Sequence, residues 1–250
     1  MTARNTTGRR ERLRQATVRQ IHAAARKLLV TQGSSAVTIN ALARELGMSG
    51  PALYRYYASR DELVEAVTAG FYRELTTFLD ETRTAWAAAP ANRRILAMCR
   101  ALRGWSTAHP AEFGWMFANP QPAHEPPPGS ESPRYQAGQA FERVFLEEVV
   151  KIWESRGFPV PDLGDLPPSL RDQVRDYSAK IGGLLPPEPL YVFLRAWIKL
   201  YGLLCMEIMK QLDFIYRDPE PVFEECLREL CDMFALEYEP PADPRESPQA

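Results

Sequence analysis

The segment that most constrains this chain spans residues 38–57, TINALARELGMSGPALYRYY, and predicts two short helices joined by a tight turn. Thr38 can cap the first helix, and Gly47 can end it because glycine adopts positive φ without steric penalty. Ser49 and Pro51 suit the cap and first turn of the second helix. Apolar residues at helical spacing give the first helix one inward stripe: Ile39, Leu42, Ala43 and Leu46. A helix pair of this size serves mainly to hold its second helix outward.

The second helix has an inward side made by Leu53 and Tyr57, which are four residues apart. The residues left facing outward or sideways are Gly50, Ala52, Tyr54, Arg55 and Tyr56. Such a short helix fits the DNA major groove, which presents a distinct donor and acceptor pattern for each base pair. A helix-turn-helix pattern alone is also common in all-α proteins, so the charge has to separate the two interpretations.

The charge is distributed unevenly along the chain. Residues 1–60 contain eleven basic and two acidic residues, whereas the rest of the chain contains nineteen basic and thirty acidic residues. The formal net charge of −2 therefore hides a basic end and an acidic remainder. Lysine and arginine displace counterions from phosphates, so this asymmetry favours polyanion binding by the N-terminal domain.

Helical signals on both sides of the pair complete a small domain. Upstream, VRQIHAAARKLLVTQG keeps helical spacing, and downstream Ser59 and Glu62 form a capping box. No segment alternates with period two, so we predict an all-α fold. The predicted domains are a three-helix helix-turn-helix domain at residues 15–60, a larger helical domain at 61–238, and disordered tails at 1–14 and 239–250. The arginine-rich first tail has no apolar core, and it is interpreted either as a minor-groove arm or as a solubilising segment.

Residues 15–70 resemble the N-terminal domain of TetR-family transcriptional regulators. The matching features are the threonine that opens the second helix, the Ala-x-x-x-Gly run into the turn, Leu53-Tyr54, and the Ser-basic-acidic-acidic-Leu start of the fourth helix. Tyr56 and Tyr57 depart from the histidine and phenylalanine that are usual at these positions. Both replacements conserve an aromatic shape.

The resemblance implies roles in DNA binding for ten residues. Gly50, Pro51, Ala52 and Tyr54 match positions that approach base edges or thymine methyl groups; Ser49, Arg55 and Tyr56 match positions near phosphates or bases; and Thr38, Arg44 and Arg60 match positions near the DNA backbone. The residues themselves leave other interpretations open. Thr38 and Ser49 are also plain helix caps, Tyr54 is also a candidate for packing against the first helix, and Arg44 for a solvated surface.

The last two helical segments, residues 189–213 and 219–236, are rich in apolar residues. Charged residues interrupt the first one, which falls short of the roughly 20 mostly apolar residues of a membrane span, so we predict no membrane partner. Two such helices from each of two subunits suit a four-helix interface, and the resemblance implies that homodimer. Trp197-x-x-x-Tyr201-Gly202 resembles a Trp-x-x-x-His-Gly pattern of one subgroup, with tyrosine in place of histidine.

The resemblance further implies a cytoplasmic repressor that leaves a palindromic double-stranded DNA operator when it binds a small apolar molecule. Residues predicted to line the ligand pocket are Trp105, Phe113, Met116, Phe117, Phe145, Trp197 and Tyr201. Ordinary core packing is the alternative for each, because aromatic residues at helical spacing are common in cores.

Catalytic, metal and cofactor sites have no support in the sequence. The three histidines are scattered, and no nucleophile lies in a known catalytic motif. Cys99, Cys205, Cys226 and Cys231 lack CxxC spacing and are predicted to be buried thiols. We therefore predict a protein that is not an enzyme and has no cofactor. Two alternatives remain: an all-α enzyme or lipid-binding module with a basic membrane or partner patch, and a ligand-free architectural DNA-binding protein.

Overall fold

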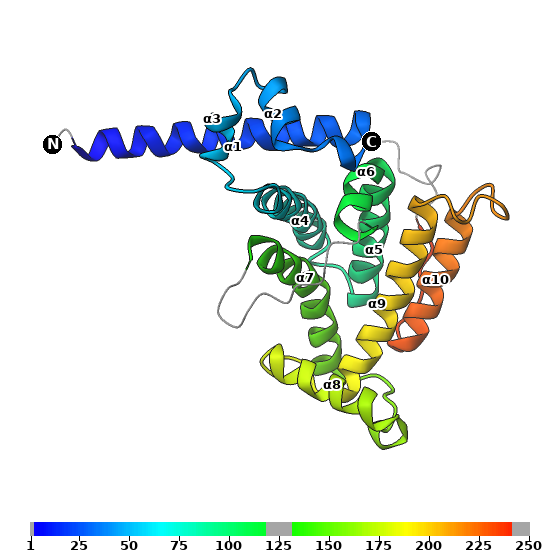
Figure 1. Cartoon of the computed structure of the whole chain (residues 1–250). Coiled ribbons are helices and arrows are strands. Elements are labelled where there is room, and N and C mark those ends of the chain that lie inside the picture. Colours follow the sequence, from blue (N-terminus) through cyan, green and yellow to red (C-terminus); the bar gives the residue numbers. More distant parts are fainter. Residues whose placement is uncertain (1–2, 119–131, 242–250) are drawn as a thin grey trace, which may run out of the picture. The chain divides into compact units, whose positions relative to one another are not determined.

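The computed structural model describes residues 3–118 and 132–241. These residues form helices and connecting segments, with no β-strand among them. They divide into two compact units: unit 1 contains residues 1–75 and 109–141, and unit 2 contains residues 76–108 and 142–250. Figure 1 shows the elements in the order of the chain. The predicted all-α fold is confirmed.

Unit 1 consists of α1 (Ala3–Gln32), a 3-10 turn (Ser34–Ala36), α2 (Ile39–Glu45), α3 (Gly50–Tyr54), the part of α4 (Arg60–Ala85) up to Leu75, α6 (Pro110–Phe113), a π-helical turn (Gly114–Ala118) and the part of α7 (Pro133–Arg156) up to Phe141. Both α2 and α6 pack against α1. Ile21, Leu42, Leu53 and Leu63 are fully buried in its core. The helix-turn-helix thus has a hydrophobic core that holds it on α1.

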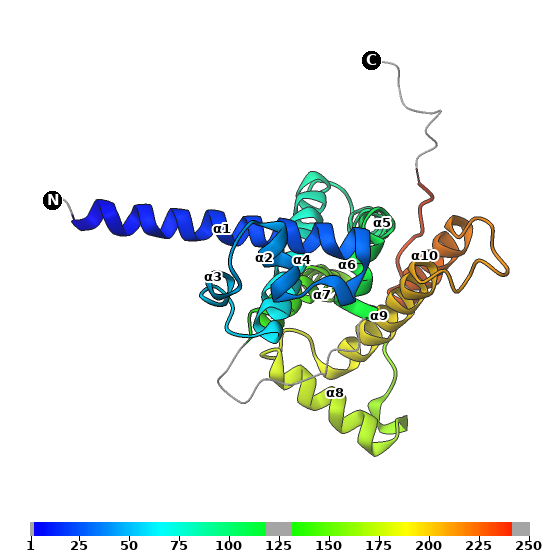
Figure 2. The same ribbon diagram turned by 45° about the horizontal axis from the view of Figure 1, so that its top comes forward.

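Helix α1 begins at Ala3, although the sequence predicts a disordered tail over residues 1–14. Gly8 is the only poor helix former between residues 8 and 20, and Gln15 donates to the Glu11 carboxylate at 3.1 Å across one helical turn. Core contacts start only at Ile21, and residues 8–15 are exposed. Figures 1 and 2 both show this N-terminal part of α1 projecting from the rest of unit 1. The basic segment is therefore an extended helix.

Unit 2 consists of the end of α4 from Thr76, α5 (Ala91–Ala108), the part of α7 from Glu142, a 3-10 turn (Leu163–Asp165), α8 (Pro168–Lys180), α9 (Pro187–Ile208) and α10 (Glu220–Met233). Helix α9 contacts α5, α8 and α10, and Figures 1 and 2 show α9 and α10 side by side. Met98, Leu190 and Phe223 bury their side chains fully between these helices. The core of unit 2 therefore lies around α9.

Helix α9 is the one helix in the described part of the chain that is long and apolar enough to cross a membrane. Length and composition alone are weak evidence, because the core helix of a soluble protein meets the same criteria. Arg195, Lys199 and Glu207 lie along this helix, and Glu207 is buried against a charged partner in unit 2. Packing against α5, α8 and α10 thus explains part of its apolar character, because 39% of the apolar stretch is buried.

Two predicted irregular segments fall largely outside the described residues. The first is the proline-rich segment at residues 121–134, which the sequence predicts to be a loop and of which residues 121–131 are not described. The second is the predicted C-terminal tail, of which residues 242–250 are not described. The tail is predicted to be disordered from residue 239, but Glu239 at its start accepts a hydrogen bond from Arg93 at 2.6 Å. The predicted domain boundary at residue 60 stays a prediction. The compact units instead divide the chain within α4 and within α7.

Candidate nucleic-acid interface

Local capping fixes the two ends of α2. The hydroxyl of Thr38 accepts a hydrogen bond from the Ala41 N–H at 3.2 Å, as a helix N-cap does. At the other end Gly47 adopts φ +63°, and the Met48 N–H reaches back to the Ala43 carbonyl at 2.8 Å. This is the left-handed C-terminal turn that a side chain would strain, so glycine is favoured here. The predicted turn at Gly47 is confirmed.

Helix α3 follows immediately and is only five residues long. The Ser49 hydroxyl accepts from the Ala52 N–H at 3.4 Å, and Pro51 lies in the first turn. Leu53 is 0% exposed, whereas the adjacent Tyr54 is 52% exposed. The same five-residue helix therefore separates an anchoring side from an outward side.

The structure places nine of the ten predicted DNA-contacting residues on α2, α3 and the turns that flank them, and the tenth, Arg60, at the start of α4. Seven of the ten lie between residues 49 and 56, from the cap of α3 to just after its end. None of the ten is buried. Arg44, Arg55 and Arg60 are exposed, and they form no ion pair with any residue that the structure describes. In contrast, Lys27 is paired with Glu45 at 2.6 Å. The uncompensated positive charge thus lies with the outward side of α3.

Asn40 joins this group, although the sequence reasoning left it unassigned. It is exposed on α2, and its side-chain Oδ1 lies 3.8 Å from the position that a Cβ on Gly50 would occupy. The sequence contained a signal for its exposure, because residue 40 lies outside the inward apolar stripe that begins at Ile39. An amide beside the first turn of α3 adds a donor and an acceptor to the candidate interface.

Tyr57 supports α3 from inside through a long-range hydrogen bond. Its hydroxyl lies 2.9 Å from Nε2 of His22 on α1, and the two rings are stacked. Burial raises the pKa of Tyr57 to about 12. Burial also lowers the pKa of His22, with a smaller contribution from the charge of Arg73. Both groups are therefore neutral at pH 7, and the bond ties the end of the helix-turn-helix to α1.

This pair makes stability depend on pH. The folded state favours neutral His22, because the pKa of His22 is lowered on folding. The stability that His22 contributes is therefore complete above the ordinary histidine pKa of about 6.5 and is lost as the pH falls below it. We expect the wild-type protein to lose more unfolding free energy between pH 7 and pH 5 than His22→Gln, which cannot titrate. Urea denaturation at both pH values measures this difference. Equal losses in the two proteins would contradict a buried neutral histidine.

A capping box begins the next helix, as predicted. The Glu62 N–H donates to the Ser59 hydroxyl at 3.1 Å, and the Glu62 carboxylate reaches back to the Ala58 N–H at 2.6 Å. The chain therefore leaves α3 and enters α4 through a defined turn. Helix α4 then contributes Leu63, Val67 and Phe71 to the core of unit 1.

The residues predicted to line a ligand pocket do not form one set. Phe113, Met116 and Phe117 belong to unit 1, where Phe117 packs against Tyr72 and Phe141 with ring centroids 5.4 and 5.8 Å apart. Trp105, Phe145, Trp197 and Tyr201 belong to unit 2. Periodicity showed that these side chains face inward but not which core each one enters.

Unit 2 contains a cavity of about 40 Å³ between α5, α7, α9 and α10. Phe145 and Trp197 line it, whereas Trp105 and Tyr201 do not. The sequence missed Cys99 and Cys231, which also line the cavity. Cys99, Cys226 and Cys231 are buried as predicted, while Cys205 is partly exposed. Within the described residues no group of three histidine, cysteine or acidic side chains is placed to hold a metal ion.

The chain is similar to known regulators over both of its halves. Residues 21–67 match the family model of bacterial regulatory proteins, tetR family, and residues 95–230 match the tetracyclin repressor-like C-terminal domain. The HTH-type transcriptional regulator Rv1816 of Mycobacterium tuberculosis is 32% identical over 121 residues. This alignment covers 48% of the present chain and 52% of the relative, so the chain spans about half the length of that relative.

Two further similarities extend over more of the chain. The uncharacterized HTH-type transcriptional regulator Rv0681 of Mycobacterium tuberculosis is 26% identical over 80% of this chain and 72% of its own length. The crystal structure of SCO4313, a candidate regulatory protein, has a TM-score of 0.67 and 26% identity, and it covers 88% of this chain and 97% of the other. The capped helix-turn-helix and the two family-model matches agree. This chain belongs to the TetR family of transcriptional regulators and carries a helix-turn-helix DNA-binding domain.

Proposed function

We propose that this regulator is a cytoplasmic, non-enzymatic homodimeric repressor that inserts α3 into the major groove of a palindromic operator. The observation that carries the proposal is the division within α3, where Leu53 is fully buried and Tyr54 is half exposed. A recognition helix needs both sides, because base contacts select a sequence only from a helix that is held in register.

The proposed contacts follow from the position and chemistry of each side chain. Gly50, Pro51, Ala52, Tyr54 and Tyr56 are assigned to base edges and thymine methyl groups, and Asn40 is added to this set. Thr38, Arg44, Ser49, Arg55 and Arg60 are assigned to phosphates. The exposed arginines on the N-terminal part of α1 extend the same positive surface, so phosphate contacts outside the central site are expected from them.

The phosphate assignment predicts a salt effect. Arg55→Ala is expected to weaken binding to all duplexes similarly and to lower the slope of log affinity against log salt by about one per subunit. Fluorescence anisotropy with a duplex that the purified protein selects from a random pool provides the measurement. Arg175→Ala is the matched control, because Arg175 is equally exposed but lies on α8 in unit 2. An unchanged slope for Arg55→Ala would remove this residue from the interface.

The homodimer proposal is supported by an apolar surface on α9 and the segment after it. Ile198 is 68% exposed and Phe214 is 81% exposed, and other exposed apolar residues of this surface are Met206, Met209 and Ile215. Exposed apolar surface of this kind commonly marks a protein interface. The outward residues of α10 are instead charged, as Glu225 and Arg228 show. The proposed interface therefore uses mainly α9.

Ile198→Glu is expected to convert the dimer to a monomer, because it places a charge inside an apolar contact. Sedimentation velocity measures the change in mass, and Leu170→Glu on α8 is the control for adding the same charge to a partly exposed apolar position. A dimer that persists in Ile198→Glu would place the interface elsewhere.

Release by a small apolar molecule is proposed for unit 2, where Phe145 and Trp197 line the apolar cavity. A ligand regulates only if it prefers the conformation that binds DNA poorly. Operator binding titrated with candidate molecules tests this step separately from DNA recognition. A protein with no operator preference would instead be the architectural DNA binder.

A further inference from the structure

A short segment after α10, Ala235–Glu239, folds back over unit 2, and we call it the strap. Ala235 takes the left-handed conformation with φ +50°, and the Leu236 N–H donates to the Cys231 carbonyl at 2.8 Å. This left-handed turn ends α10 abruptly. It buries Phe234 and Leu236 toward the interior, while Glu237 and Tyr238 face the surface side.

Polar groups on α5 hold the strap in place. Asn92 donates its side-chain N–H groups to the Glu237 carbonyl at 2.9 Å and to the Glu239 carboxylate at 3.0 Å. Arg93 pairs with the Glu239 carboxylate at 2.6 Å, and Arg100 donates to the Glu239 carbonyl at 2.7 Å. The anchoring contacts thus join residues that lie about 140 positions apart in the chain.

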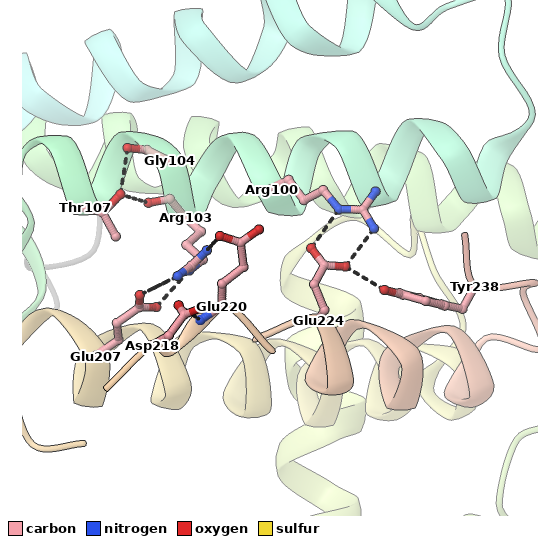
Figure 3. A network of polar contacts seen from close by, with 9 residues as sticks. All are labelled: Arg100, Arg103, Gly104, Thr107, Glu207, Asp218, Glu220, Glu224 and Tyr238. Atoms are coloured by element: carbon pink, nitrogen blue, oxygen red, sulfur yellow. Dashed lines mark hydrogen bonds and ion pairs between the residues drawn. The ribbon is translucent and has the colours of Figure 1, made fainter. Parts of the chain in front are cut away.

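A second set of contacts comes from α10, as Figure 3 shows. The Glu224 carboxylate accepts hydrogen bonds from Arg100 Nε at 2.9 Å and Nη2 at 2.7 Å, and from the Tyr238 hydroxyl at 2.8 Å. The Arg228 guanidinium lies 4.3 Å from the centre of the Tyr238 ring. The strap is therefore fastened by hydrogen bonds and partly exposed ion pairs, which contribute little stability individually.

The side of the strap that faces inward has the opposite character. Leu236, with Phe234 at the end of α10, lines the cavity of about 40 Å³ in unit 2, and the remaining lining is aliphatic, aromatic or thiol. No carboxylate, ammonium or guanidinium lies among the lining residues. A charged ligand would lose its hydration there without gaining a partner.

We infer that the strap is the removable wall of a binding site for a small uncharged apolar molecule. This inference rests on the ligand response proposed above and specifies its site. The other walls are α5, α7, α9 and α10, whose separation would disrupt the core of unit 2. Release of the strap instead breaks its polar anchors, the hydrogen bond from Arg156 on α7 to the Ala235 carbonyl, and the packing of Leu236. The cavity is partly open and is much smaller than the roughly 150 Å³ that holds benzene, and departure of Leu236 supplies the missing volume.

Two lining thiols report on the position of the strap. Burial raises the pKa of Cys99 well above its usual range, and burial raises the pKa of Cys231 to about 11. Since the thiolate is the reactive form, both cysteines react slowly while the strap is closed. Methyl methanethiosulfonate is small and uncharged, and it converts an accessible thiolate into a methyl disulfide with release of methanesulfinate. Mass spectrometry of a Cys205→Ser, Cys226→Ala background follows Cys99 and Cys231 alone.

In this background Glu239→Gln, which weakens the contacts with Asn92 and Arg93, is expected to raise the labelling rate by about three- to fivefold, as the loss of one partly exposed anchor would. Glu147→Gln is the matched control, because it weakens partly exposed ion pairs with Arg83 on α4 and Arg143 on α7 without touching the strap. Benzene is expected to slow labelling of Glu239→Gln by occupying the opened site, while benzoate, which carries a charge, leaves the rate unchanged.

Equal labelling rates in Glu239→Gln and Glu147→Gln would overturn the inference, as would equal protection by benzene and benzoate. Urea denaturation of the same variants separates strap release from global unfolding. A faster rate that merely follows a loss of global stability also counts against the strap. Operator binding by the same variants is measured in parallel. If labelling changes as expected but the protein binds no operator, the inference about the strap stands and only the proposed function is refuted.

Discussion

Replacing Tyr54 with alanine is expected to lower affinity for a selected operator on the order of 10- to 100-fold, because contacts to bases each discriminate by about 1–3 kcal/mol. The melting temperature should remain nearly unchanged, since Tyr54 is half exposed on the outward side of α3. Fluorescence anisotropy and thermal unfolding of the same preparation provide the two measurements. A large loss of DNA binding with intact folding would support base contact by this side chain.

Leu53→Ala is the matched comparison on the adjacent position. Leu53 is fully buried, so its truncation should cost about 2–5 kcal/mol of unfolding free energy and disturb DNA binding through loss of structure. If Tyr54→Ala destabilised the protein as much as Leu53→Ala, the tyrosine would be a packing residue. If Tyr54→Ala bound the operator normally, the recognition surface would have to be reassigned.

The second large effect is expected at Glu148 on α7, whose side chain is 1% exposed. It pairs with Arg94 at 2.6 Å and with Lys151 at 2.7 Å. Burial alone would raise the pKa of Glu148, but the hydrogen bonds from Lys151 and Arg94 outweigh it and lower the pKa. Glu148→Ala leaves Arg94 largely buried without a carboxylate partner. Such a broken buried pair costs about 3–5 kcal/mol of unfolding free energy.

The neighbouring residue supplies the control for this prediction. Glu147 pairs with Arg83 and Arg143 but is 41% exposed, so Glu147→Ala should cost about 0–1 kcal/mol. Urea denaturation at pH 7 measures both variants. Similar losses for Glu147→Ala and Glu148→Ala would mean that water reaches Arg94 more readily than its burial indicates. The contribution of Glu148 should also disappear as the pH falls below about 4.5, because its depressed pKa stabilises the fold only while it is ionised.

The sequence was most informative where structure depends on neighbouring residues. Thr38, Gly47, Ser49 and Ser59 act within three or four positions of their partners, and all four form the predicted caps or turn. The alternation of buried Leu53 and exposed Tyr54 was likewise predictable from helical spacing. The family model over residues 21–67 confirms what those local signals implied.

Features that depend on distant residues were not predictable in this way. The hydrogen bond between His22 and Tyr57 spans 35 positions, and the one between Asn92 and Glu239 spans 147. Helical spacing also could not assign aromatic residues to a unit, and the structure places Phe113 in unit 1 and Phe145 in unit 2. The disorder expected at the N-terminus neglected that a helix anchored at Ile21 can propagate backward through residues that favour helix.

Two glycines of the helix-turn-helix have opposite tolerance for substitution, with a consequence for how such regulators diverge. Gly47 needs its positive φ, so nearly any replacement damages the turn. Gly50 has an ordinary helical backbone, and an added Cβ would meet only the Asn40 side chain at 3.8 Å, a normal contact distance. Since Gly50 is proposed to contact bases, mutation at residue 50 is expected to change the chemistry presented to DNA while the scaffold stays intact. On this proposal, descendants of the chain would acquire new operator preferences in single steps at residue 50, whereas changes at residue 47 would damage the turn.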